Sequence, residues 1–187
     1  MLQYNPAAVE ILDSTVVELS RSNLTTQRSC HFIEGHPAAI LIVEFYSEDA
    51  QEVLERPQCM IEELKQLGIG YAYPLFPEGK DYDDVWLIRK KGLGLMLGIK
   101  GNKKPLPFIE DAGIPTPVLP EYIDRVLKIC KKHQTEVAMY AHASVGVIHV
   151  RPILDLRLKG DIERFQRIAD ETFSLVQHYG GSWSGEH

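Results

Sequence analysis

The sequence predicts a single α+β domain over residues 1–187, a ferredoxin-like two-layer fold with helices on one face of a largely antiparallel sheet. Short apolar segments rich in branched side chains alternate with longer segments of helical periodicity. Two consecutive strands, 136–143 and 147–152, are close enough to form a hairpin, so their pairing is antiparallel. No repeat, low-complexity tract or flexible linker divides the chain, and its length suits one core.

The chain is expected to open with a helix. Asn5 can cap it, and Pro6 can occupy the first helical position, where a missing N–H costs nothing. Apolar residues then recur at a helical spacing, at Val9, Leu12, Val16 and Leu19. The sequence therefore predicts a helix from Pro6 to Leu19.

Two strands and two helices are expected next. Residues 39–45 are rich in branched side chains and predict a buried strand. Residues 47–67 predict a helix that Pro57 interrupts or kinks. A short strand is expected at 71–76, and a helix begins near Tyr82.

The second half begins with glycines and prolines at 92–107, too many for one regular element. Three prolines, at 115, 117 and 120, then predict a rigid connection. The regular elements expected here are a strand at 108–111 that ends in an acidic pair, a helix at 121–133, the two hairpin strands, and a helix from Asp161 to Gly180-Gly181.

Composition and charge narrow the class of protein. The chain has 20 basic and 26 acidic residues and a net charge of −6, so it has no general attraction for nucleic acid or anionic lipid. Its three cysteines (Cys30, Cys59 and Cys130) form no closely spaced pair, which argues against a disulfide framework or a zinc ribbon. The N-terminal residues lack the pattern of a signal peptide. We expect a soluble, cytoplasmic protein.

A pair of histidines is the first candidate site. If the hairpin loop is centred between Val145 and Gly146, His142 and His149 lie directly opposite each other. Opposed residues have Cβ atoms roughly 4.5–5.5 Å apart. The two imidazoles could then chelate a divalent ion together with a third ligand such as a carboxylate. The alternative is that they hydrogen-bond each other or solvent.

A basic stretch is the second candidate. Residues 89–104 hold six of the twenty Lys and Arg residues. The glycine spacing within it does not match a dinucleotide-binding turn, and it follows a helix rather than a strand. It is either a solvated basic face or an anion-binding loop in which Arg89 and Lys104 hold a carboxylate.

Two segments together resemble a known family. Residues 140–152, Tyr-Ala-His-Ala-Ser-Val-Gly-Val-Ile-His-Val-Arg-Pro, and residues 180–187, Gly-Gly-Ser-Trp-Ser-Gly-Glu-His, resemble the C-terminal (cap) domain of the FAD-linked oxidases. Residues 5–13, the Trp86-x-x-Arg89 motif and residues 104–115 extend the resemblance over nearly the whole chain. Val147 and residues 143–145 depart from the family pattern.

The resemblance implies the substrate-binding part of a flavin-dependent D-2-hydroxy-acid dehydrogenase, acting on a substrate such as glycolate, D-lactate or D-2-hydroxyglutarate. It implies that His142, His149 and Glu186 ligate a divalent metal, zinc by preference, and that His187 is the general base. Arg89 and Lys104 would clamp the substrate carboxylate.

The resemblance also implies FAD, bound mainly by a domain that precedes this region and is absent here, so the chain is expected to be a truncated cap domain, inactive by itself. Residues 143–146 and the Gly-Leu-Gly-Leu run at 92–95 resemble long members with a fused iron–sulfur region. Such a parent protein would be cytoplasmic or peripheral to the inner membrane.

A free-standing α+β metal- or ligand-binding module without redox activity is the alternative. The coding sequence upstream and downstream would separate the two hypotheses. We also expect residues 181–187 to be mobile or displaced, with Glu186 and His187 not held against the two histidines, because glycine-rich ends fray.

Overall fold

A computed structural model describes residues 1–186. Its regular elements are, in order, the 3₁₀ turn η1 (Leu2–Tyr4), β1 (Ala8–Asp13), α1 (Ser14–Ser22), η2 (Gln27–Cys30), β2 (Ala39–Glu44), α2 (Glu52–Gln66), α3 (Lys80–Leu97), β3 (Lys104–Pro105), β4 (Ile109–Gly113), η3 (Thr116–Val118), α4 (Leu119–Lys132), β5 (Val137–His142), β6 (Val147–Leu154) and α5 (Lys159–His178). The chain is an α+β domain, as predicted.

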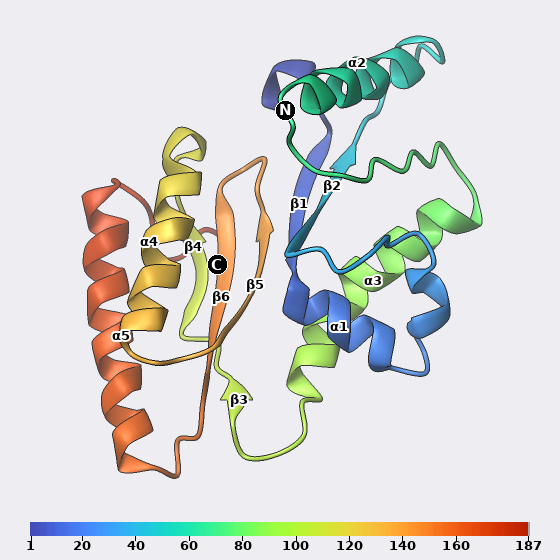
Figure 1. Cartoon of the computed structure of the whole chain (residues 1–187). Helices are drawn as coiled ribbons and strands as arrows, with labels where there is room; N and C mark the ends of the chain where they lie inside the picture. Colours follow the sequence, from blue (N-terminus) through green and yellow to red (C-terminus); the bar gives the residue numbers. More distant parts are fainter. Residues whose placement is uncertain (187) are drawn as a thin grey trace.

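The strands form one six-stranded sheet whose pairings are all antiparallel. The order is β2-β1-β5-β6, and the far edge of β6 pairs with β4 and with β3 (Figure 1). β5 and β6 therefore lie in the interior of the sheet. This explains why β6 is buried along almost its whole length.

Helices cover both faces of the sheet, which corrects the prediction of helices on one face. Met139 and Ala141 of β5 belong to a core cluster with Tyr122 of α4 and Ile168 of α5. The alternate residues of β5, Ala138 and Tyr140, belong to a second cluster with side chains from α1 and α3. Successive strand residues point to opposite faces, so α4 and α5 lie on one face and α1 and α3 on the other (Figure 1).

The predicted N-terminal helix is wrong over its first half. Residues 8–13 form β1, which pairs with β2 on one side and β5 on the other, and only residues 14–22 are helical. Asp13 caps α1 by accepting a hydrogen bond from the Val16 amide at 3.0 Å. A strand with two partners buries its apolar residues on both faces, so its pattern overlaps with that of a helix.

Two other predictions about elements also need correction. The described residues at 71–76 form no strand. α3 continues through Gly92 and Gly94 to Leu97, although the glycines predicted a break. A side chain at position 92 would place its Cβ 3.0 Å from Cγ1 of Val16, so Gly92 allows α3 to pack closely on α1. No helix in the described part of the chain is both long and apolar enough to cross a membrane.

Candidate functional site

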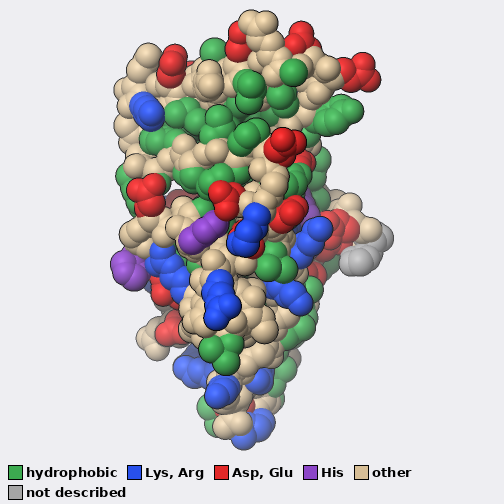
Figure 2. Space-filling model, turned by 90° about the vertical axis from the view of Figure 1, so that its right-hand side faces the viewer, with side chains coloured by type: hydrophobic (Ala, Val, Ile, Leu, Met, Phe, Trp, Pro, Cys, Tyr) green, Lys and Arg blue, Asp and Glu red, His purple; other side chains and the backbone are tan. Residues whose placement is uncertain are grey.

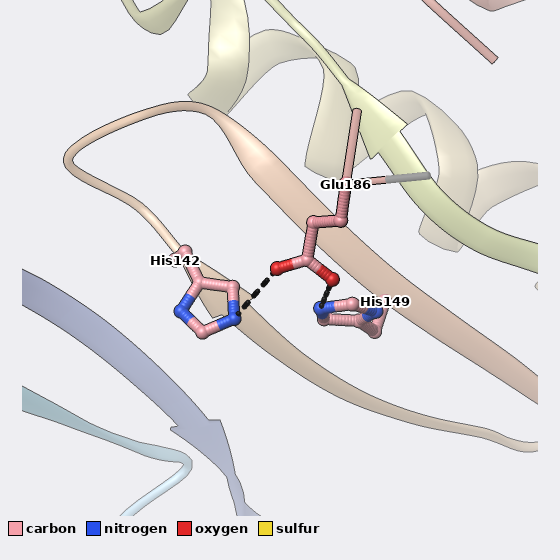
Figure 3. Close-up of side chains that lie close together, drawn as sticks. All are labelled: His142, His149 and Glu186. Carbon is pink, nitrogen blue, oxygen red and sulfur yellow. Dashed lines mark ion pairs between the residues drawn. The ribbon is translucent and has the colours of Figure 1, made fainter. Parts of the chain in front are cut away.

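Three side chains from separate elements meet on the sheet (Figure 3): His142 at the end of β5, His149 in β6 and Glu186 in the segment after α5. One carboxylate oxygen of Glu186 lies 3.1 Å from Nε2 of His142, and the other lies 3.7 Å from Nε2 of His149. One ligand atom from each residue lies within 4.8 Å of the other two. The sequence predicted this trio through the family resemblance.

The hairpin register brings the histidines together differently from the prediction. Tyr140 pairs with His149, and His142 pairs with Val147, so the register is shifted by two residues from the predicted one. A shift by two keeps both side chains on the same face as diagonal neighbours. Their ring centroids are 5.5 Å apart at an interplanar angle of 80°.

Each histidine is held from behind by a carboxylate. Nδ1 of His142 lies 2.7 Å from Glu10, and Nδ1 of His149 lies 2.8 Å from Glu110. Glu10 is directly opposite His142 in the pairing of β1 with β5, which explains the first contact. A carboxylate at Nδ1 favours the tautomer whose Nε2 carries the lone pair, the arrangement typical of metal-binding histidines. Both Nε2 atoms face Glu186.

A β-bulge positions the second of these carboxylates. The register between β4 and β6 shifts between Ile109 and Ala112, so β4 holds one extra residue there. Asp111 has a φ of 67°, in the left-handed region. Ile109 and Ala112 both face the core, while Glu110 reaches His149 on the opposite face. The bulge therefore directs Glu110 to the site.

The same strand holds the C-terminal segment. The backbones of Gly113 and Ser182 exchange two hydrogen bonds of 2.8 and 2.9 Å, and the amide of Gly185 donates to the carbonyl of Asp111 at 2.8 Å. The Ser184 hydroxyl donates to the Asp111 carboxylate at 3.0 Å. These contacts place Glu186 over the histidines, which corrects the expectation that it would be displaced. His187 lies outside the described residues.

Two arginines complete the network. Arg89 contacts Glu10 at 2.7 Å, and Arg151 contacts Glu110 at 2.7 Å. Both guanidinium groups lie over the ring of Tyr140, at 5.0 and 5.7 Å from its centroid. The Tyr140 ring also stacks on His149, with centroids 4.3 Å apart. This packing fixes the orientation of the histidine ring.

The electrostatics of the site follow from burial and these contacts. Burial raises the pKa of Glu110, but its hydrogen bond from His149 and the charge of Arg151 outweigh burial and leave the pKa lowered. Burial, followed by the charge of Glu110, raises the pKa of Tyr140. Glu110 is therefore an anion and Tyr140 a neutral phenol at pH 7.

The donor set suits a divalent cation. Three carboxylates (Glu10, Glu110 and Glu186) face two guanidinium groups, which leaves an excess negative charge beside the imidazoles. A neutral imidazole that donates from Nδ1 has no proton at Nε2 to offer Glu186. A cation between the two Nε2 atoms and the Glu186 carboxylate would give each of these three acceptors a partner. Two imidazole nitrogens and one carboxylate are a common set in catalytic zinc sites, with a position left for substrate.

The structure does not bring all the predicted residues to this site. Arg89 is present, 3.4 Å from Nδ1 of His142. Lys104 pairs with Leu154, five residues beyond His149 along β6, and its amine donates to the carbonyl of Ile99 at 2.5 Å. The described structure therefore gives Lys104 no contact with the histidines.

Sequence reasoning missed the supporting residues Glu10, Glu110, Tyr140 and Arg151. Tyr140 and Arg151 each stand two positions from a histidine in a predicted strand, so they had to share its face. Glu110 belonged to the acidic pair at the end of a predicted strand. The contact of Glu10 with His142 could not be predicted, because the strand that holds Glu10 was predicted as a helix.

A second group of potential ligands lies at the start of α3. His31 is 2.9 Å from Asp81 and 3.9 Å from Asp84. The amine of Lys80 contacts Asp84 at 2.5 Å and already neutralises it. The Ser29 hydroxyl occupies the other Asp84 oxygen. The histidine pair with Glu186 is therefore the stronger metal candidate.

Comparison with known proteins relates the chain to one family of oxidases. Residues 1–187 match the family model for FAD linked oxidases, C-terminal domain. The chain is 31% identical over 198 residues to D-2-hydroxyglutarate dehydrogenase of Haemophilus influenzae, covering 100% of this chain and 19% of that protein. It is 23% identical over 186 residues to glycolate oxidase subunit GlcD of Bacillus subtilis, covering 97% of this chain and 36% of that subunit.

Proposed function

The chain belongs to the FAD-linked oxidase C-terminal domain family, and we propose that it is the substrate-binding part of a longer flavoenzyme that oxidises a 2-hydroxy acid to the 2-oxo acid. The chain spans about a fifth of the D-2-hydroxyglutarate dehydrogenase of Haemophilus influenzae and about a third of the glycolate oxidase subunit of Bacillus subtilis. Both names describe oxidation of a 2-hydroxy acid, which supports that substrate class for the parent protein.

One observation carries the proposal. Both histidines have Nδ1 held by a glutamate and direct Nε2 at the carboxylate of Glu186. Such a preorganised pair of imidazoles, each oriented by a carboxylate at Nδ1, is typical of metal ligands. We assign His142, His149 and Glu186 as the ligands of a divalent metal, zinc by preference.

The residues around this trio fit a 2-hydroxy-acid substrate. A bound divalent ion would supply Lewis acidity that lowers the pKa of the substrate hydroxyl. FAD, held by the remainder of the parent chain, would supply the redox chemistry of the oxidation. Arg89, beside His142, orients the substrate carboxylate through charge-assisted hydrogen bonds. Next along the chain from Glu186, His187 takes the hydroxyl proton as the general base.

The metal assignment is tested in the full-length parent protein with His142→Ala and His149→Ala. Each variant should lose bound metal and activity while keeping its circular dichroism spectrum. His178→Ala is the matched control, because His178 is exposed at the end of α5, remote from the trio. Metal is measured by inductively coupled plasma mass spectrometry. An unchanged metal content in both variants would show that the ligands are assigned wrongly.

The base is tested with His187→Ala in the same protein. Loss of a general base should lower kcat by roughly 10²- to 10⁴-fold while the metal stays bound. The decrease should shrink at high pH, where the substrate hydroxyl ionises more readily. A near-normal kcat would show that His187 is not the general base. The assignment of the metal ligands would be unaffected.

A further inference from the structure

An apolar groove lies beside the metal candidate and is left open in the described part of the chain. Its cavity has a volume of about 380 Å³ and is bounded by β2, α2, the segment 69–77 and the first turns of α3. Figure 2 shows a continuous band of hydrophobic side chains on this side of the molecule. The lining includes Ile42, Leu54, Met60, Tyr71 and Trp86.

Large apolar side chains along this groove are exposed to solvent. Tyr71 is 62% exposed and Ile69 is 50% exposed, and Leu41 and Leu54 are each 43% exposed. Single exposed apolar residues are common, but a contiguous apolar patch of this kind marks an interaction surface.

The groove is a fixed part of the fold. α2 is anchored by polar contacts: Tyr4 donates to Glu63 at 2.6 Å, and Arg56 donates to the carbonyls of Asn5 and Tyr46 at 3.1 and 2.6 Å. These contacts tie α2 to the segments that precede β1 and follow β2, while its apolar side chains line the cavity. β2 is also an edge strand that pairs only with β1 among the described residues, so its outer edge can accept another backbone.

Charge indicates the chemistry of the occupant. Residues 31–84, which supply most of the groove, contain twelve Asp and Glu residues and three Lys and Arg residues. Acidic side chains border the hydrophobic band in Figure 2. A second copy of this chain, with a net charge of −6, is disfavoured as the occupant by like-charge repulsion. An apolar segment with a positive net charge complements the groove.

The groove and the site are connected through two elements, α3 and β2. Trp86 lines it, and Arg89 follows one turn later on α3. Ile42 lines it, and Ile42 pairs with Glu10, the partner of His142. An occupant would therefore contact elements that also carry the residues behind the metal ligands.

We propose that an apolar, positively charged segment of the parent polypeptide, from outside these 187 residues, packs in this groove and adds to the edge of β2. The inference rests on the proposed function, because it takes the chain as one part of a longer enzyme. The matched region makes up only 19% of the Haemophilus influenzae dehydrogenase, so a parent protein of similar length would hold many further segments that could fill the groove.

Photocrosslinking in the purified full-length parent protein tests the proposal. p-Benzoylphenylalanine replaces Leu54 in the groove or, as a control, Leu158, which is 54% exposed at the start of α5. We expect the probe at position 54 to crosslink within one molecule to a peptide outside residues 1–187, and the probe at 158 to give no such product. A crosslink between two copies, or no crosslink at position 54, would overturn the proposal.

A substitution gives an independent measurement. Leu54→Asp should lower the melting temperature of the parent protein by about 3 °C or more, since a charge would be buried under the segment, whereas Leu158→Asp should not. Equal melting temperatures for both variants would contradict the proposal. Metal content should be unchanged in Leu54→Asp, so failure of this inference is distinguishable from failure of the metal assignment.

Discussion

Glu10 and Glu110 occupy corresponding positions behind the two histidines, yet each also holds a different cation. Glu10 joins His142 to Arg89, and Glu110 joins His149 to Arg151. Glu10 is 6% exposed, so it can satisfy its charge only through these partners. One carboxylate thus fixes both a metal ligand and the arginine that we assign to the substrate carboxylate.

This difference predicts two distinguishable variants of the parent enzyme. Glu10→Gln and Glu110→Gln should each weaken metal affinity by roughly 10- to 100-fold, as expected when the outer partner of a metal-binding histidine is lost. Glu10→Gln should also raise KM for the hydroxy acid at saturating metal, because Arg89 loses its partner. Glu110→Gln should leave KM unchanged.

The measurements are metal titration, followed by kinetics with metal in excess. Glu18→Gln is a suitable control, because Glu18 lies on α1 and, within residues 1–186, forms ion pairs with Arg21 and His36 and not with the site. Equal KM values for the two site variants would show that Arg89 does not bind the substrate. Unchanged metal affinity in both variants would show that Glu10 and Glu110 do not support the metal-binding histidines.

At the scale of elements, the end of α5 and the bulge of β4 act together. Gly180 has a φ of 66° and ends the helix, and the amide of Gly181 donates to the carbonyl of Val176 at 2.9 Å. The chain then turns back to pair with Gly113 of β4. A Cβ at position 181 would lie 2.6 Å from the carbonyl oxygen of Gly113. Only glycine allows this approach.

Gly181→Ala should therefore displace the segment that carries Glu186 while the rest of the domain stays folded. We expect metal affinity to fall at least as much as the roughly 10- to 100-fold loss caused by an outer-partner variant. Gly160→Ala is the control, because a Cβ there meets nothing within 4 Å. Isothermal titration with zinc, alongside circular dichroism, measures both effects. Wild-type affinity in Gly181→Ala would mean that Glu186 is not a ligand.

The sequence predicts some of these elements and misses others for physical reasons. The two hairpin histidines stay on the same face of the sheet when the register shifts by an even number of residues. The predicted register was wrong by two residues, so it still placed both side chains on one face. β1 was missed because its pairing partners are distant in sequence, and Asp13 was not recognised as a cap. The bulge at Glu110 depends on tertiary pairing and leaves no local pattern.

Over the whole molecule, the sheet separates two hydrophobic cores. Cys130 of α4 lies in the cluster on one face, and Cys30 of η2 lies in the cluster on the other. The predicted α+β class followed from the alternation of strands and helices. The covering of both faces could not be predicted, because it requires knowing that α1 and α3 pack against the same side of β1 and β5.

The three cysteines test whether the two cores unfold together. Burial raises the pKa of the Cys130 thiol to about 11 and also raises the pKa of Cys30, while Cys59 is exposed on α2. An unfolded thiol has a pKa of roughly 8.5, so burial of neutral Cys130 contributes stability that is complete below about pH 8.5 and is lost as the pH rises toward about 11. At pH 8, the fold should keep both buried thiols protonated and unreactive.

We therefore expect iodoacetamide at pH 8 to alkylate Cys59 alone in the folded chain, as measured by peptide mass spectrometry. With increasing urea, Cys30 and Cys130 should become reactive at the same concentration, because β5 contributes side chains to both clusters and couples them into one cooperative unit. Cys59 serves as the internal control for reagent activity. Two separate transitions would show that the faces of the sheet unfold independently, and rapid alkylation of Cys130 without urea would contradict its burial.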